Sequence, residues 1–309
     1  MKITVVGVGA VGGYFGGRLA EFGCDVTFVA RGSTLDALRG AGLQIQSPLG
    51  DAKIKPVQVA ASTAEAGPAD VVVLGVKAWQ VAGLAASLKP GLASDGFVLP
   101  LQNGIEAPDV LISALGQDHA VGGLAKIIAK VEQPGRIVHF GAEPAIVLGE
   151  LDNRPSLRIE AFRDVLREAG IGATIPGSIQ AAMWGKFLFI TAMSGLGAAV
   201  RAPLGVIREQ PESRALVRGV MEEVAAVAAA RGVGLDEDVV DRSMAFMDSL
   251  SAEGTASMQR DLAEGRPSEL EDQTGAVVRL GREVGVPTPI NAFLYGVLVP
   301  HERAARSGE

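Results

Sequence analysis

The sequence predicts an α/β fold, in which a doubly wound parallel sheet is followed by an all-helical domain. Two observations indicate it. In the first half of the chain, short apolar runs rich in β-branched residues alternate with amphipathic stretches, as expected for parallel strands covered by helices on both faces. After Pro176 the strand pattern fades and apolar residues recur at helical spacing. Because 309 residues leave room for two domains, we expect domains at residues 1–176 and 177–309.

In the first domain, four runs are apolar on both faces and are the expected strands. They are residues 2–6, 24–29, 70–76 and 97–101. Amphipathic stretches such as residues 11–22 and 79–88 lie between them, so we expect βαβ units. Beyond Gly135, two runs at residues 136–140 and 145–148 are separated by Gly141 and Pro144, which predicts a β-hairpin where the sheet ends.

The second domain is expected to be helical. The predicted helices are residues 180–199, 213–231, 236–250, 269–284 and 289–301. Residues 187–200 carry no charge but are fewer than the roughly 20 residues that a membrane-spanning helix needs, so we expect a buried helix and no membrane partner. The N-terminus lacks a basic segment followed by an apolar core, so export by a signal peptide is not expected.

Composition and charge exclude several classes of protein. The chain is 48% hydrophobic and 20% charged, which is the composition of a folded globular protein rather than a disordered one. Its 28 basic and 35 acidic residues give a net charge of −7, which opposes binding to nucleic acid. A single cysteine, Cys24, cannot form an internal disulfide, and with three histidines it offers no metal-ligand spacing. We therefore expect a cytoplasmic protein without a metal.

A glycine-rich turn follows the first strand and opens a helix. Its residues are Gly7, Val8, Gly9, Ala10, Val11 and Gly12. The first glycine permits a tight turn, the second lets the backbone approach a pyrophosphate, and the third lets helix and strand pack closely. The position of this motif indicates a dinucleotide site, and the alternative is a plain tight turn.

The second strand ends at Val29 and is followed by Arg31. An NAD site usually has a carboxylate here for the ribose 2′-hydroxyl, whereas a 2′-phosphate needs a cation. After Arg31, no acidic residue occurs until Asp36. We therefore expect NADP(H) as the cofactor, the alternative being a solvated surface arginine.

One lysine, Lys186, lies in an expected helix that is apolar on nearly every face. Burial of an ammonium without a partner is costly, so this lysine should pair with a carboxylate or line a cavity. Its functional interpretation is a proton donor to a carbonyl oxygen that is being reduced. The alternative is a lysine that extends its amino group to solvent. Glu269, beyond Pro267, could be its partner or could complement a helix dipole.

Together these residues resemble the ketopantoate reductase (2-dehydropantoate 2-reductase) family over essentially the whole chain. Besides the glycine turn and Arg31, the matching segments are Lys77-Ala78-Trp79-Gln80, Leu101-Gln102-Asn103-Gly104, Trp184-Gly185-Lys186, Ser257-Met258-Gln259-Arg260-Asp261 and Ser268-Glu269-Leu270. The resemblance implies a Rossmann-type NADP-binding domain, a helical catalytic domain, and reduction of the 2-oxo group of ketopantoate by NADPH in pantothenate synthesis.

The resemblance also implies roles for individual residues. Lys186 is similar to the family's catalytic general acid, and Glu269 to the carboxylate that orients it beside the nicotinamide. Lys77 and Asn103 are similar to cofactor and substrate contacts at the ends of strands. Ser257 is similar to the hydroxyl that binds the substrate carboxylate, and Ala129 to a backbone contact with the cofactor.

At three positions the chain departs from the family. Where the family has substrate-binding asparagines four and eight residues after the lysine, this chain has Ile190 and Ser194, the latter still a candidate substrate contact. A third such asparagine aligns with Leu204. Loss of amide donors alters recognition of a hydroxylated 2-oxo acid. We expect a paralogue that reduces ketopantoate or a more apolar 2-oxo acid.

Two alternatives stay open. An imine (opine-type) reductase would keep the cofactor and reduce a C=N bond, and a non-catalytic NADP-binding regulatory protein would keep only the fold. A homodimer is compatible with the sequence.

Overall fold

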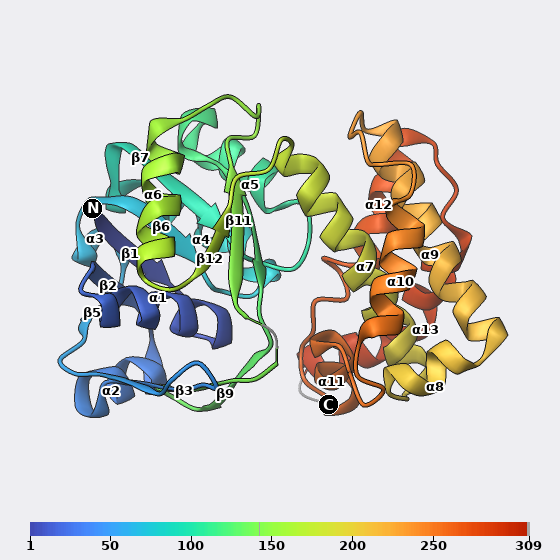
Figure 1. The fold of residues 1–309 in the computed structure, drawn as a ribbon, viewed down its shortest axis with the longest axis horizontal. Helices are drawn as coiled ribbons and strands as arrows, with labels where there is room; N and C mark the ends of the chain where they lie inside the picture. The colour runs from blue at the N-terminus through green and yellow to red at the C-terminus, as the bar shows by residue number, and fades with distance from the viewer. Residues whose placement is uncertain (142, 308–309) are drawn as a thin grey trace. The chain divides into compact units, whose positions relative to one another are not determined.

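The computed structural model describes residues 1–141 and 143–307, and the chain divides into two compact units. The first comprises Met1–Gln102 and Glu106–Ile179, and the second comprises Asn103–Ile105 and the chain from Gln180 onward. Figure 1 shows both units, with labels on most of their helices and strands. The predicted fold class is confirmed, because a parallel sheet with covering helices forms the first unit and the elements of the second, over the described residues, are helices.

The central sheet of the first unit has five parallel strands in the order β5-β2-β1-β6-β7. They are β1 (Lys2–Val6), β2 (Asp25–Val29), β5 (Gln58–Ala60), β6 (Ala69–Leu74) and β7 (Leu92–Pro100). The last residue of β1, Val6, pairs with Val29 and with Leu74, so these strands end level with one another. The strand order reverses between β1 and β6, which is where open α/β sheets bind ligands, at the carboxyl ends of the strands.

Apolar side chains cover both faces of this sheet. On β6, Val71 and Val73 belong to one core cluster, whereas Val72 and Leu74 belong to another. This arrangement explains why the strand is apolar on both faces. The helices of this unit are α1 (Ala10–Phe22), α2 (Gly32–Ala41), α3 (Thr63–Ala66), α4 (Val81–Leu84), α5 (Ala107–Leu115) and α6 (Leu157–Glu168). The single helix expected at residues 79–88 is instead α4 between two 3₁₀ segments, in a stretch where Gly83 and Pro90 disfavour a regular helix.

The hairpin predicted beyond Gly135 is wrong, because its two strands belong to different small sheets. The first sheet has the order β4 (Ala52–Ile54), β3 (Leu43–Gln46), β10 (Arg136–His139) and β9 (Ala129–Gln133). The second has the order β12 (Gly172–Thr174), β11 (Ala145–Gly149) and β8 (Gly122–Lys126). The turn that brings β10 back along an antiparallel partner is at Gly135, whose φ is +78°, and that partner is β9.

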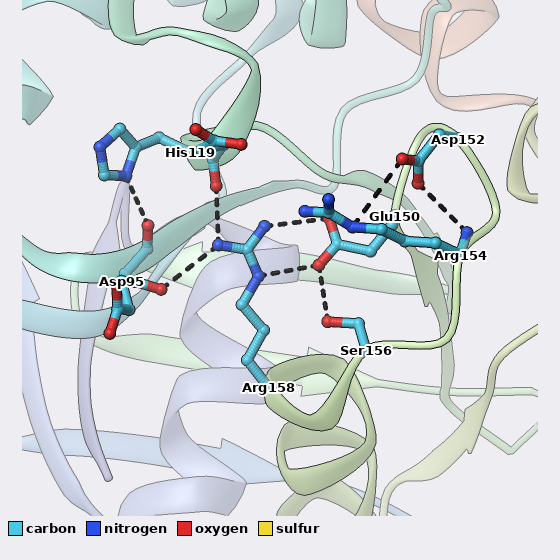
Figure 2. A network of polar contacts seen from close by, with 9 residues as sticks. Asp95, His119, Glu150, Asp152, Arg154, Ser156 and Arg158 are labelled. Atoms are coloured by element: carbon cyan, nitrogen blue, oxygen red, sulfur yellow. Dashed lines mark hydrogen bonds and ion pairs between the residues drawn. The ribbon is translucent and has the colours of Figure 1, made fainter.

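An ion pair joins Glu150, the residue that follows β11, to Arg158 of α6 in the first unit (Figure 2). The Glu150 side chain is 4% exposed, and Arg158 donates to its two carboxylate oxygens from Nε at 2.8 Å and from Nη2 at 2.9 Å. Ser156 Oγ donates to the same carboxylate at 2.7 Å, and Arg158 Nη1 donates to the Asp118 carbonyl at 2.7 Å. Burial opposes ionisation of Glu150, but the hydrogen bonds from Arg158 and Ser156 outweigh it and hold the pKa of this carboxyl below its usual range.

The second unit packs its helices around one apolar cluster. These helices are α7 (Ile179–Val200), α8 (Leu204–Glu209), α9 (Pro211–Ala230), α10 (Val239–Ser249), α11 (Ser257–Ala263), α12 (Thr274–Val284) and α13 (Pro289–Ser307). The sequence did not indicate α8 and α11, which have six and seven residues and so show little periodicity. The helix expected from residue 269 begins only at Thr274, because residues 270–273 form turns.

Within the described part of the chain, α7 is a helix whose length and composition would allow it to cross a membrane. Of its most apolar stretch, 61% is buried inside the protein, as in the core helix of a folded domain.

Candidate active site

The glycine turn connects β1 to α1 at the carboxyl edge of the central sheet. Gly7 has a φ of +92°, and its N–H donates to the Val29 carbonyl at 3.1 Å, which ties the turn to the end of β2. A Cβ on Gly7 would lie 2.6 Å from Val76, and one on Gly12 would collide with the carbonyl oxygen of Gly7. These two positions therefore accept only glycine if the strand, turn and helix are to stay this close.

Gly9 differs from these two glycines and fits a bound pyrophosphate. It precedes the first residue of α1, is partly exposed, and a Cβ placed on it would lie 3.6 Å from its nearest neighbour, the Gly75 carbonyl. The fold alone would accept a side chain here. A glycine in an open position at a helix N-terminus leaves room for phosphate groups to approach the backbone N–H donors. The residues present thus fit a dinucleotide, with Val8, Ala10 and Val11 completing the turn.

Arg31 lies just beyond β2, at the start of α2, and its side chain is exposed. Within residues 1–141 and 143–307, no hydrogen bond or ion pair engages its guanidinium. Because the Gly7 N–H bonds to Val29, two residues earlier, Arg31 belongs to the same edge of the sheet as the glycine turn. An exposed cation at this place is suited to the 2′-phosphate of NADP(H).

Lys77 follows β6 at the same edge. Its Nζ lies 5.6 Å from the centre of the Trp79 ring, and its backbone N–H donates to Gln80 Oε1 at 3.0 Å. The segment before it is held by Gln102, which is 8% exposed and whose Nε2 donates to the carbonyls of Leu74 at 2.9 Å and Val76 at 3.0 Å. Gln102 belongs to the motif Leu101-Gln102-Asn103-Gly104, but nothing in the sequence indicated its role. Its position indicates that it fixes the backbone between β6 and Lys77.

Ala129, which the resemblance implies is a backbone contact with the cofactor, is the first residue of β9, and it pairs with His139 of β10. Its side chain packs against the core cluster that includes residues of α1. The structure therefore places Ala129 in the first unit on a different sheet from the glycine turn.

In the second unit, three of the predicted site residues form a hydrogen-bonded chain. Lys186 Nζ donates to Asn103 Oδ1 at 3.0 Å, and Asn103 Nδ2 donates to Glu269 Oε2 at 3.2 Å. The amide thus presents its oxygen to the cation and its nitrogen to the carboxylate. Asn103 thus links Lys186 to Glu269, the carboxylate that the sequence offered as a possible partner.

Local geometry explains how Asn103 reaches this position. The next residue, Gly104, has a φ of +130°, and a Cβ on it would lie 3.2 Å from the Asp272 carbonyl. The turn therefore needs glycine both for its backbone conformation and for its close approach to residues 269–272. Ile105 then packs against the apolar cluster of the second unit. This explains why Asn103–Ile105 belongs to the second unit although its chain neighbours belong to the first.

The environment of Glu269 includes a residue that sequence reasoning missed. Glu269 is 5% exposed, and its backbone carbonyl accepts from the Gln273 N–H at 2.9 Å. Gln273 is fully buried, and its Nε2 donates to Glu269 Oε2 at 3.5 Å. Glu269 and Gln273 are four residues apart in the sequence, a spacing that occurs throughout any helix. A helix expected from residue 269 therefore gave no reason to single out Gln273.

The exposed positions of α7 near Lys186 form one stripe. Lys186, Phe189, Ile190 and Met193 are all partly exposed and recur at helical spacing. Phe189 and Met193 also pack against the apolar cluster that contains Trp184, and the Phe189 ring centre lies 5.0 Å from that of Phe246. Lys186 therefore shares one face of α7 with three partly exposed apolar residues, two of which also contact the core of the second unit. Met193, which the sequence did not indicate, belongs to this face.

Three further predicted positions lie outside the Lys186–Asn103–Glu269 chain. Ser194 is fully buried on α7, and its Oγ has no hydrogen-bond partner among the described residues. Ser257 is the first residue of α11 and is partly exposed. Leu204 is 6% exposed in the apolar cluster of the second unit. Over the described residues, no hydrogen bond joins either serine to Lys186, Asn103 or Glu269.

Family models match most of the chain. The model described as ketopantoate reductase PanE/ApbA matches residues 3–153, and the model described as its C terminal matches residues 178–302. The chain belongs to the ketopantoate reductase family. The resemblance inferred from its motifs is therefore confirmed.

Individual members and structures agree with this assignment. The uncharacterized oxidoreductase YkpB of Bacillus subtilis (strain 168) is 30% identical over 302 residues, which cover 98% of this chain and 99% of that protein. The crystal structure of 2-dehydropantoate 2-reductase from Geobacter metallireducens GS-15 has a TM-score of 0.90 at 32% identity and covers 97% of this chain and 99% of its own. A ternary structure of D-mandelate dehydrogenase with NADH and anilino(oxo)acetate has a TM-score of 0.90 at 24% identity, covers 99% of this chain and 100% of its own, and shares the fold.

As a ketopantoate reductase family member, the chain is an oxidoreductase with a Rossmann-type first unit. It acts on a small molecule with a nucleotide cofactor. The prediction of NADP(H) as that cofactor is confirmed at the level of the family.

Proposed function

We propose that this ketopantoate reductase family member reduces the oxo group of a 2-oxo acid to a hydroxyl group, with NADPH as the reductant. The observation that supports it most is the chain of hydrogen bonds from Lys186 through Asn103 to Glu269. A cation on an apolar helix that is held by an amide, which itself bonds to a carboxylate, is suited to donate a proton.

In this proposal the nicotinamide, when bound, supplies a hydride to the carbonyl carbon. The Lys186 ammonium donates a hydrogen bond to the carbonyl oxygen and then a proton as negative charge develops there. Asn103 holds the ammonium through its oxygen, and Glu269 fixes the orientation of the Asn103 amide. The hydroxyl of Ser257, a partly exposed residue, would bind the substrate carboxylate. Glycines 7, 9 and 12 with Arg31 and Lys77 would hold the cofactor.

For the substrate, we propose a 2-oxo acid with an apolar side chain. Beyond Lys186, the partly exposed residues on the same face of α7 are Phe189, Ile190 and Met193, of which Phe189 and Met193 also contact the core. The family's amide positions are here an isoleucine, a fully buried Ser194 and a Leu204 within the core. An apolar face favours an apolar side chain, and without amide donors a hydroxylated substrate loses hydrogen bonds. The relative of known structure from Geobacter metallireducens is a 2-dehydropantoate 2-reductase, so ketopantoate is the reference substrate.

The test is a panel of 2-oxo acids with apolar, aromatic and hydroxylated side chains, ketopantoate included, assayed by loss of NADPH absorbance with wild-type protein and Lys186→Ala. We expect turnover by the wild type, with kcat/KM highest for an apolar member, and about a hundredfold or greater loss in the variant. Equal rates for the two proteins on every acid would overturn the assignment. If ketopantoate is the best substrate, the apolar preference is wrong, and a cytoplasmic role in pantothenate synthesis is supported instead.

The same assay separates the two alternatives. Turnover that requires added ammonia or an amine would assign an imine reductase. Tight NADPH binding without turnover of any acid or amine mixture would leave a non-catalytic NADP-binding protein.

A further inference from the structure

A second buried carboxylate lies next to the Glu269 turn. Glu302 of α13 is 1% exposed, and its two carboxylate oxygens accept from the Ser268 N–H at 3.1 and 3.0 Å. Oε2 also accepts from Ser268 Oγ at 2.5 Å, and Arg306 Nε lies 2.6 Å from Oε1. Arg306 in turn donates from Nη2 to the Ser268 carbonyl at 3.1 Å. One residue, Ser268, is thus held by its N–H, its carbonyl and its hydroxyl.

These contacts fix the backbone on both sides of Glu269. Before it, Ser268 is tied to Glu302 and Arg306. After it, the Leu270 N–H donates to Ser268 Oγ at 3.3 Å, so the same hydroxyl spans the turn. A residue between two anchored neighbours has little freedom to move its side chain away from Asn103.

We propose that Glu302 is a positioning residue for the active site: by holding Ser268, it sets the place of the Glu269 carboxylate and, through Asn103, of the Lys186 ammonium. The proposal rests on the proposed function for its effect on turnover. Its physical basis is that a buried carboxylate which accepts several hydrogen bonds is costly to disturb, so it fixes the groups around it. Glu302 itself touches none of the reacting groups in this scheme.

The same unit contains a matched control. Glu223 of α9 also accepts two backbone N–H bonds and one side-chain bond from α13: from Ile290 N at 2.7 Å, Asn291 N at 2.9 Å and Asn291 Nδ2 at 2.7 Å. The Glu223→Gln variant therefore weakens a similar carboxylate anchor of α13, but not the one at Ser268. If Glu302 only stabilises the fold, the two glutamine variants should behave alike.

The experiment compares Glu302→Gln with Glu223→Gln at a temperature well below both unfolding midpoints, using the best 2-oxo acid of the panel. We expect Glu302→Gln to lower kcat about tenfold, because small misplacements of catalytic groups are costly, while KM for NADPH stays within about twofold. Glu223→Gln should keep wild-type kcat. Equal kcat values for the two variants would overturn the proposal. Should Glu302→Gln fail to fold, Ser268→Ala removes only the hydroxyl contacts and is measured in its place, with the same expectation and the same overturning result.

A second measurement needs no turnover, so it distinguishes failure of this proposal from failure of the proposed function. The rate at which acetic anhydride modifies Lys186 is followed by peptide mass spectrometry in each variant, with Glu269→Gln as the positive control. We expect about a fivefold change from wild type in Glu302→Gln and in Glu269→Gln, the effect of weakening one hydrogen bond of Lys186, and none in Glu223→Gln. An unchanged rate in Glu302→Gln beside a changed rate in Glu269→Gln would overturn the positioning role, whether or not any 2-oxo acid is reduced.

Discussion

Replacement of Asn103 by alanine tests the central hydrogen-bonded chain of the site. The variant removes both bonds of the amide: the one accepted from Lys186 Nζ at 3.0 Å and the one donated to Glu269 Oε2 at 3.2 Å. Each joins the amide to a charged group, and such bonds contribute about 1.5–3 kcal/mol. Because Asn103 is only partly buried, water would replace part of the two lost hydrogen bonds. We therefore expect a total loss of about 3 kcal/mol of transition-state stabilisation. That corresponds to about a hundredfold lower kcat/KM.

Asn291→Ala is the matched control for this prediction. Asn291 is fully buried in the same unit, and its Nδ2 donates to the Glu223 carboxylate at 2.7 Å, so the variant also removes an amide–carboxylate bond. We expect it to lower the free energy of unfolding by about 1–3 kcal/mol while kcat/KM stays within about twofold of wild type. The pair is assayed by NADPH oxidation and by thermal unfolding. If Asn103→Ala keeps more than half of the wild-type kcat/KM, the proposed path from Glu269 to Lys186 is refuted.

Three further predictions concern the first unit. Arg31→Ala should raise the KM for NADPH about tenfold or more, because charge-assisted bonds to the 2′-phosphate are lost. The KM for NADH should change little. Equal changes in the KM for the two cofactors would contradict this role of Arg31. Gly9→Ala should keep the melting temperature but weaken NADPH binding, as measured by fluorescence. Gly12→Ala, whose Cβ would collide with the Gly7 carbonyl, should lower both the melting temperature and the affinity for NADPH. A lower melting temperature with unchanged NADPH affinity in Gly9→Ala would contradict the assignment of Gly9 to the phosphate. Glu150→Gln should lower the free energy of unfolding near pH 7 by about 2 kcal/mol. Since the pKa of Glu150 is lowered in the folded protein, this stabilisation is present above the unfolded-state pKa and is lost as the pH falls through the lower folded-state pKa. The difference from wild type in urea unfolding should therefore shrink below about pH 4, and a difference that grows there would show that Glu150 is not the group responsible.

Local sequence patterns predicted the parts of the fold in which one periodicity dominates. The strand at Lys2–Val6 and the helix that follows the glycine turn were found nearly to the residue, because burial on both faces and a glycine-rich turn are local features. The hairpin was wrong because two strands five residues apart can pair with other partners, and pairing depends on contacts distant in sequence.

In the site, residue types were more predictable than their contacts. A lone lysine in an apolar helix indicated that Lys186 has a partner, and the family motifs suggested Glu269. Neither observation revealed that Asn103 stands between them, since its contacts span 83 and 166 residues of sequence. Glu302 carried no local feature except its spacing to Arg306, and its role emerges only when α13 is placed beside Ser268.

The most direct measurement of the proposed chemistry is the single-turnover rate of NADPH oxidation by Lys186→Ala, with the best 2-oxo acid at saturation and NADPH binding measured separately. If Lys186 is the proton donor, this rate should fall about a hundredfold or more, while the Kd for NADPH stays within about twofold. A rate close to that of the wild type would contradict the account and remove Lys186 from the chemical step.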